Sequence, residues 1–258
     1  MGEARARRWL DRHGATDRPT TPLLRARLDA RYQGEMLSWV LIGVAIVAYL
    51  VAATLSTEPR PGRTSLYQVG FFYAAMALAV IAGLWLQGRN ERRIGQALIR
   101  RVAHPQAVSV GAVVGRWFVV ATVVTVGAGV LVGVAAEVGA ADPEDRGVGL
   151  ILLAAVGVFA LIGLVGLVHV VRRPAIAEDE QSLGDDLLLR REDALRVVLP
   201  YPALLALIAA IQSRSLTVLF VLLGYAVVAA TVWFLANWAA THASAARPAA
   251  ASTGATAA

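Results

Sequence analysis

The sequence contains no cysteine and no lysine. Without cysteine the chain can form no disulfide, offers no thiol nucleophile and has no thiolate metal ligand, and its redox compartment is left open. All 24 basic residues are arginines, a usage typical of high-GC coding. Charged residues of both signs together make up only 16% of the 258 residues. Too few polar side chains therefore remain to cover a water-soluble globule of this length.

Apolar residues dominate the composition. They make up 57% of the chain, and the mean hydropathy is +0.61. Six apolar stretches stand out, at 36–55, 65–87, 117–138, 148–171, 197–211 and 216–238. Five of them reach about 20 residues, the length that carries a helix across a hydrocarbon core of roughly 30 Å. The sequence thus predicts an all-α, polytopic transmembrane helical bundle with six spans, in a membrane domain covering 36–238.

The fifth stretch is the weakest of the six. Its 15 residues give a helix of only about 22 Å, and Pro200 and Pro202 interrupt it. Prolines are tolerated in membrane helices when neighbours satisfy the freed carbonyl groups. We expect the stretch to span, and a re-entrant or buried segment is the alternative.

The distribution of arginine predicts the orientation. The segment before the first span, the second and fourth loops and the tail hold nineteen arginines, Arg116 left out, whereas the first, third and fifth loops hold four. Cytoplasmic loops of membrane proteins carry the excess of basic residues. Six spans with both termini in the cytoplasm fit this alternation, and the plasma membrane is the expected location. Topology thus explains the pI near 10.4 better than nucleic-acid binding does.

The two ends of the chain differ in character. Residues 1–35 are expected to form a cytoplasmic segment in which Leu24, Leu28 and Tyr32 recur every four residues among arginines. That pattern is typical of an interfacial helix on anionic headgroups, and equally of a solvated extension of the first span. Residues 239–258 are mostly Ala, Ser, Thr and Pro, so this tail is expected to be disordered.

Ionisable residues are placed at the ends of the predicted spans and not at mid-depth. Arg116 and His169 lie at the expected cytoplasmic ends, and Glu137 lies at an outer end. A charge at mid-membrane costs about 2.5–3.5 kcal/mol or more and marks an ion or proton pathway. We therefore interpret these three as interfacial residues, with a substrate or proton site as the alternative.

Glycine and proline mark the other candidate positions. Gly129 and Gly133 form a GxxxG pattern, which favours close packing of helix backbones. Pro200 and Pro202 could break the fifth helix and expose carbonyl groups to a cavity, as in transporters. The simpler interpretation places them in the first turns of that helix, where a missing N–H matters less.

The fourth loop, residues 172–196, carries five arginines and seven acids. Its leucines fall on one side of a predicted helix, which could dock on a membrane or cytoplasmic partner protein or fold back over the chain's own cytoplasmic ends. Metal binding by the acids is a weaker hypothesis, because nothing fixes a ligand set and the arginines compete.

This loop also carries a resemblance. Two arginines and a proline leave a span, and an acidic run, Ser182-Leu183, Asp185-Asp186 and a second charged run follow. The pattern, with the six-span layout, resembles uncharacterised multi-span membrane proteins of high-GC actinomycetes. Some such proteins are encoded near ABC exporters or GntR-type regulators, and by this association the resemblance implies an accessory role.

The function classes follow mainly by exclusion. The sequence has no HExxH, no GxS serine elbow and no Walker loop, so no catalytic, cofactor or metal site is predicted. The leading hypothesis is a non-enzymatic structural or accessory subunit of a transport or sensing complex. A small-molecule or lipid transporter is the alternative, its cavity lined by Tyr49, Tyr73, Thr122, Thr125, Tyr225 and Thr231. A membrane enzyme using Arg116, His169 and the acids of the fourth loop is the third hypothesis.

Overall fold

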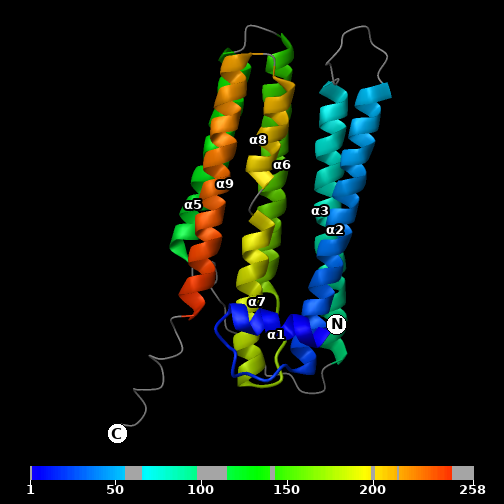
Figure 1. Ribbon diagram of the computed structural model, residues 1–258, viewed down its shortest axis with the longest axis vertical. Coiled ribbons are helices and arrows are strands. Elements are labelled where there is room, and N and C mark those ends of the chain that lie inside the picture. The colour runs from blue at the N-terminus through cyan, green and yellow to red at the C-terminus, as the bar shows by residue number, and fades with distance from the viewer. Residues whose placement is uncertain are drawn as a thin grey trace.

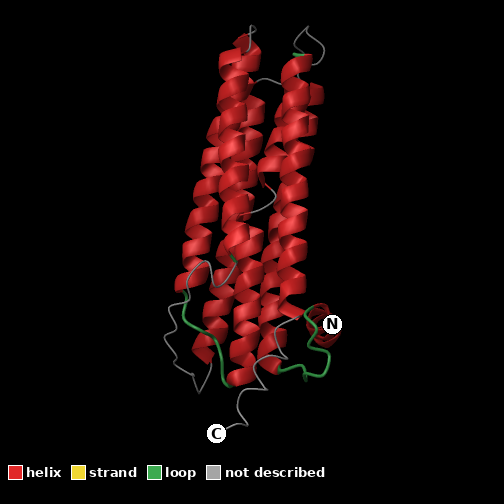
Figure 2. Ribbon diagram, turned by 90° about the vertical axis from the view of Figure 1, so that its left-hand side faces the viewer, coloured by secondary structure: helices red, strands yellow, loops and turns green. Residues whose placement is uncertain are grey.

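The computed structural model describes residues 2–55, 66–97, 115–139, 143–198, 201–213 and 215–245, and in these ranges helices joined by loops are the only regular secondary structure. The helices are α1 (Gly2–Arg12), α2 (Pro22–Leu55), α3 (Leu66–Ala97), α5 (Arg116–Gly139), α6 (Pro143–Arg172), α7 (Glu180–Val198), α8 (Tyr201–Gln212) and α9 (Leu216–Ala245). Apart from α1, they run along the long axis of one bundle in both views (Figures 1 and 2).

From α2 onward, and with α7 and α8 taken as one column, the helices alternate in direction along the chain. Figure 1 shows α2 and α3 as one hairpin, beside a second group made of α5, α6 and α9. Helices α7 and α8 follow each other end to end as one broken column within that second group. Consequently α1 and the end of α9 lie toward the same end of the bundle, the end that the arginines predict to be cytoplasmic.

Five of these helices are long and apolar enough to cross a membrane, among the described residues: α2, α3, α5, α6 and α9. The predicted all-α membrane bundle is therefore confirmed. Helix α8 has 12 residues and is about 18 Å long, shorter than the hydrocarbon core. It reaches from one end of the bundle toward the other only together with α7, so six spans stay a prediction.

The outer surface of the bundle is apolar. Large hydrophobic side chains are exposed along every long helix, for example Trp39 on α2, Phe71 on α3, Leu131 on α5, Val165 on α6 and Phe220 on α9. A water-soluble protein seldom exposes apolar patches of this extent, whereas lipid is a matching solvent for them. The chain is an integral membrane protein.

Glycines set how closely the helices approach. A Cβ added to Gly34 on α2 would lie 2.7 Å from the carbonyl oxygen of Gly83 on α3. On the other side of the bundle, a Cβ on Gly149 of α6 would lie 2.8 Å from the backbone nitrogen of Glu137 on α5. Because backbone atoms cannot move aside as a side chain can, only glycine fits these two crossings.

The first helix of the membrane domain begins well before its apolar part. Pro22–Leu55 is one continuous helix, with Thr21 Oγ1 accepting a hydrogen bond from Leu24 N (3.1 Å) as an N-cap. The extension is packed and not solvated, because Leu24 and Leu28 are buried against Trp9 on α1. Helix α1 lies across this end of the bundle (Figure 1).

Candidate functional site

Arg27 and Arg31 are buried at the end of the bundle that the arginine distribution predicts to be cytoplasmic. They lie one turn apart on α2, so both side chains leave the same face, and only 1% and 2% of their side-chain surface is exposed. Arg27 Nη2 lies 2.6 Å from Asp186 Oδ1, and Arg31 Nη2 lies 2.6 Å from Asp193 Oδ2. Because the two aspartates are two turns apart on α7, they also share one face. The two helices are therefore joined through paired charges.

The start of α7 is fixed by a reciprocal cap. Asp179 Oδ1 accepts a hydrogen bond from Ser182 N (2.7 Å), and Ser182 Oγ accepts one from Asp179 N (2.9 Å). The hydrogen bonds from Ser182 lower the pKa of the Asp179 carboxyl. This cap sets where α7 begins, and hence the register that aims Asp186 and Asp193 at α2.

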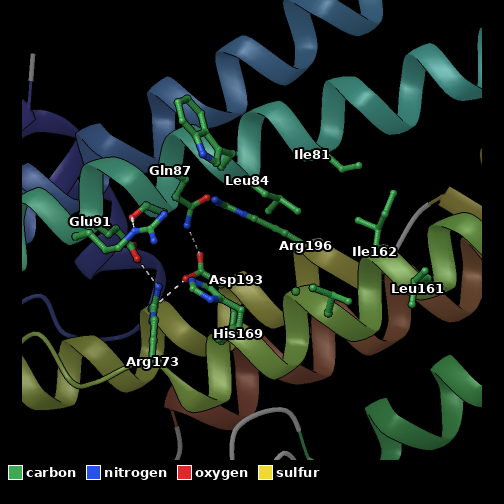
Figure 3. Close-up of a pocket in the computed structure, with 16 residues that line it drawn as sticks. Ile81, Leu84, Gln87, Glu91, Leu161, Ile162, His169, Arg173, Asp193 and Arg196 are labelled. Carbon is green, nitrogen blue, oxygen red and sulfur yellow. Dashed lines mark hydrogen bonds and ion pairs between the residues drawn. The ribbon is translucent and has the colours of Figure 1, made fainter.

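Helix α3 and the end of α6 complete the arrangement. Arg31 Nε lies 3.4 Å from Glu91 Oε1 on α3. Arg173, just after α6, pairs with the same Glu91 and also places Nη2 3.0 Å from Asp193 Oδ2. Gln87 Nε2 donates a hydrogen bond of 3.0 Å to Asp193 (Figure 3). Four segments distant in sequence thus meet around one carboxylate.

The paired charges around these contacts form a balanced network, and we call it the ion-pair core. It consists of four arginines and four acids: Arg27, Arg31, Arg173, Arg190, Glu91, Asp186, Glu192 and Asp193. Removing one member would leave a buried charge uncompensated, which costs about 3–5 kcal/mol. Such a core mainly determines how the helices are arranged relative to one another. It contributes less to the net free energy of folding.

Burial and pairing shift the pKa values of the core in defined directions. Burial alone would raise the pKa of Asp193, but Arg31 and Arg173 outweigh it, so that pKa is lowered. The pKa of Arg173 is raised for the reciprocal reason, because Asp193 and Glu91 outweigh its desolvation. Both groups are thus held in their charged forms across the physiological pH range.

Asp185 behaves differently, although it is next to Asp186. Burial raises its pKa, and Arg18, whose Nη1 lies 3.5 Å from Asp185 Oδ1, opposes the rise only in part. The arginine is partly exposed, with 43% of its side-chain surface accessible, so the pair is weak.

The arrangement supplies little for catalysis. A general base must hold a free lone pair near neutral pH and reach a substrate, whereas the carboxylates of the ion-pair core are held by guanidinium groups. Among the described residues, no three histidines and acids gather as a metal-ligand set. The core is therefore suited to holding helices together.

A cleft of about 490 Å³ lies beside the ion-pair core, between α3 and α6. Figure 3 shows its two ends: Glu91, Arg173 and Asp193 gather at one end, and Ile81 and Leu161 lie at the other. The cleft thus has a charged end, near the predicted cytoplasmic surface, and an apolar end that points into the bundle's membrane part.

Of the ionisable residues predicted as candidates, the structure places one in this cleft. His169 is exposed and lines its charged end. Glu137 is half-buried near the end of α5, at the α5–α6 crossing. Arg116 is the first residue of α5, and its side chain lies outside the described part of the structure. Of the acids in the 172–196 segment, Asp193 lines the same cleft as His169.

The glycine and proline candidates fall at packing positions. A Cβ on Gly129 would lie 2.6 Å from Tyr225 Oη, and one on Gly133 would lie 2.8 Å from Leu153 Cδ2. Pro202 is the second residue of α8, in its first turn, and Pro200 lies outside the described residues. The GxxxG pair thus does pack helices closely within this chain.

Two of the hydroxyl groups expected to line a transport cavity are engaged elsewhere, whereas Thr122 Oγ1 is buried without a hydrogen-bond partner in the described part of the structure. Tyr73 Oη donates to the carbonyl oxygen of Leu205 (2.9 Å), and Tyr225 Oη donates to that of Thr125 (2.7 Å). Both hydrogen bonds tie neighbouring helices together inside the bundle. None of these side chains lines the cleft.

Sequence reasoning missed the ion-pair core. The positive-inside pattern and the expected interfacial helix account for Arg27 and Arg31 without any buried partner. A signal was nevertheless present: Asp186 and Asp193 repeat at seven residues, with Arg190 between them, and Arg27 and Arg31 repeat at four. Two helices carrying complementary charges at helical spacing can pair through these faces.

Comparison with known proteins adds no family to this description: no protein-family model, no curated protein and no solved structure matches the chain.

Proposed function

We propose that this integral membrane protein is a non-enzymatic subunit with a structural or accessory role in a membrane transport or sensing complex. The observation that carries the proposal is the ion-pair core, in which four arginines and four acids at one end of the bundle pair with one another. Charged side chains that carry ions, protons or substrates through a membrane must be able to exchange their binding partners. A balanced set of close ion pairs instead supports a body of fixed shape.

Part of the 172–196 segment stays available to a cytoplasmic partner, and helix α1 adds to this surface. Asp185, Asp186 and Asp193 of the 172–196 segment point into the protein and are buried. The outward groups at this end include Leu187 on α7, 40% exposed, and the exposed arginines Arg7, Arg8 and Arg12 on α1. A partner that docks here would therefore present acids and apolar side chains.

A lipid or small-molecule transporter is the second candidate, and the cleft between α3 and α6 favours it. Beyond the apolar end of the cleft, however, a tightly buried cluster that includes Phe72, Met76, Leu152 and Phe159 fills the bundle. A transporter would have to open this cluster to give its substrate a path to the far side. The accessory role requires no such change.

Co-purification and reconstitution test the proposal together. Membranes solubilised in two mild detergents should give one discrete complex, with the same partner in both, and replacement of Arg7, Arg8 and Arg12 by Gln should weaken it. The isolated chain in liposomes should mediate no flux of ions or fluorescent lipids. Flux by the chain alone, or a chain that migrates only as a monomer in both detergents, would contradict the accessory role.

A further inference from the structure

We propose that the cleft between α3 and α6 binds one anionic phospholipid from the cytoplasmic-side leaflet. Its phosphate would lie at Arg92 and His169, and one acyl chain would follow the apolar wall toward Ile81 and Leu161. This inference is independent of the accessory role proposed above, because a transporter or a structural subunit could hold such a lipid equally well.

The cleft has the polarity of a phospholipid. Along α6, the lining changes from Leu161, Ile162 and Val165 to His169 and Arg173. Eight residues of helix separate Leu161 from His169, which is about 12 Å along the axis. The apolar wall is thus long enough for the first half of an acyl chain, and it ends where the headgroup region of a bilayer is expected.

The apolar part of the cleft is accessible from the side. Ile81 and Trp85 on α3 are 46% and 56% exposed, and Leu161 and Val165 on α6 are 61% and 60% exposed. These four residues belong to the lining on both sides of the cleft. Because they face the surroundings of the bundle, a lipid chain can enter laterally from the bilayer without crossing the protein.

The charges at the polar end favour an anion. Glu91 and Asp193 line this end, but both are held by Arg31 and Arg173 of the balanced ion-pair core. Arg196, which also lines it, pairs with Glu35. Arg92 adds a further positive charge, and no carboxylate within the described residues pairs with it. The unbalanced charge of the cleft is therefore positive.

Two donors flank one glycine at this end. Arg92 Nε donates a hydrogen bond of 3.1 Å to the carbonyl oxygen of Gly88, which leaves its terminal amino groups for another acceptor. A Cβ placed on Gly88 would lie 3.9 Å from His169 Nε2, with no other neighbour within 4 Å. Guanidinium and imidazole N–H groups around an open space suit the oxygens of a phosphate.

Native mass spectrometry of the purified, delipidated full chain tests the site. The protein would be incubated with equal amounts of phosphatidylglycerol and phosphatidylcholine that carry the same acyl chains. We expect one phosphatidylglycerol to be retained, with a preference of roughly tenfold over phosphatidylcholine. Inorganic phosphate at millimolar concentration should leave this retention unchanged, because it lacks the acyl chain.

Two variants and two matched controls locate the binding. Arg92→Gln should reduce the preference for phosphatidylglycerol to near one. Gly88→Leu should reduce the retention of both lipids, because its side chain fills the cleft. Arg93→Gln, an exposed neighbour outside the lining, and Gly70→Leu, where an added Cβ has no atom within 4 Å, should behave as the wild type.

The melting temperature of each variant shows whether the fold is kept, and the hydrogen bond of Arg92 to Gly88 lies within α3. Equal retention of the two lipids by the wild type would overturn the proposal. So would wild-type retention in both Arg92→Gln and Gly88→Leu, or displacement of the lipid by inorganic phosphate.

Discussion

Arg31 on α2 and Asp193 on α7 are 162 positions apart in the chain, and yet their side chains meet with Nη2 only 2.6 Å from Oδ2. Arg31 also donates to the carbonyl oxygen of Leu189 (2.7 Å), so α7 holds it at two points. This contact fixes the α2–α3 hairpin against the rest of the bundle. Removing this contact should therefore lower the stability of the whole bundle.

Replacing Arg31 by Ala should lower the free energy of unfolding by about 3–5 kcal/mol, because Asp193 and Glu91 lose a buried partner. The double replacement Arg31→Leu with Asp193→Leu keeps the core neutral and should cost less than the single change. Titration with a denaturing detergent, followed by circular dichroism, measures both. Arg7→Ala is the control: it removes an exposed pair with Glu3 and should cost no more than about 1 kcal/mol.

Acid should destabilise the protein through Asp193. Its pKa is lowered in the folded state, so between this pKa and the unfolded value near 3.9 the unfolded chain binds more protons. The stability that the group contributes is present above pH 4 and is lost as the pH falls through the folded pKa. Melting temperatures between pH 7 and pH 3 should show this loss, and Asp193→Asn should flatten the curve. If the melting temperatures of the wild type and of Asp193→Asn fell in parallel with pH, groups other than Asp193 would cause the acid sensitivity.

The crossing of α2 and α3 should tolerate no side chain at Gly34. Because the added Cβ would meet the backbone oxygen of Gly83 at 2.7 Å, Gly34→Ala must separate the two helices and should cost about 1–3 kcal/mol. Gly43→Ala on the same helix has no atom within 4 Å of its new Cβ and should be neutral or stabilising. Thermal unfolding in detergent micelles compares the two. Equal effects would mean that the helices approach less closely than described.

The natural lack of cysteine allows a direct test of the six-span topology. Asp17→Cys, between α1 and α2, should react with a membrane-impermeant maleimide only after permeabilisation. Ser213→Cys, between α8 and α9, should react in intact cells, because the α7–α8 column is expected to bring it to the outer face. If Ser213→Cys is protected in intact cells and labelled from inside, α8 does not cross.

The long apolar helices could be predicted because a span needs about 20 apolar residues whatever its neighbours are. The crossings could be predicted only in part. Gly129 and Gly133 form a motif within one helix, but Gly34 and Gly83 meet across two helices, and a single sequence does not pair them. The ion-pair core could not be predicted for a related reason. Arg27 follows the positive-inside rule, and it also pairs with Asp186, which lies 159 residues further along the chain. Because the rule alone explains an arginine at this position, the sequence does not indicate the buried partner.

This double use of the same arginines has a consequence for biogenesis. At about 5–20 residues per second, a ribosome needs roughly ten seconds or more to travel from Arg27 to Asp186. Through that interval Arg27 lacks Asp186 and Arg31 lacks Asp193, so in the predicted orientation both arginines can act as positive-inside signals during insertion. When α7 has been synthesised, Asp186 and Asp193 pair with these arginines and neutralise them. The positive charges that orient the first hairpin are therefore no longer free in the folded protein.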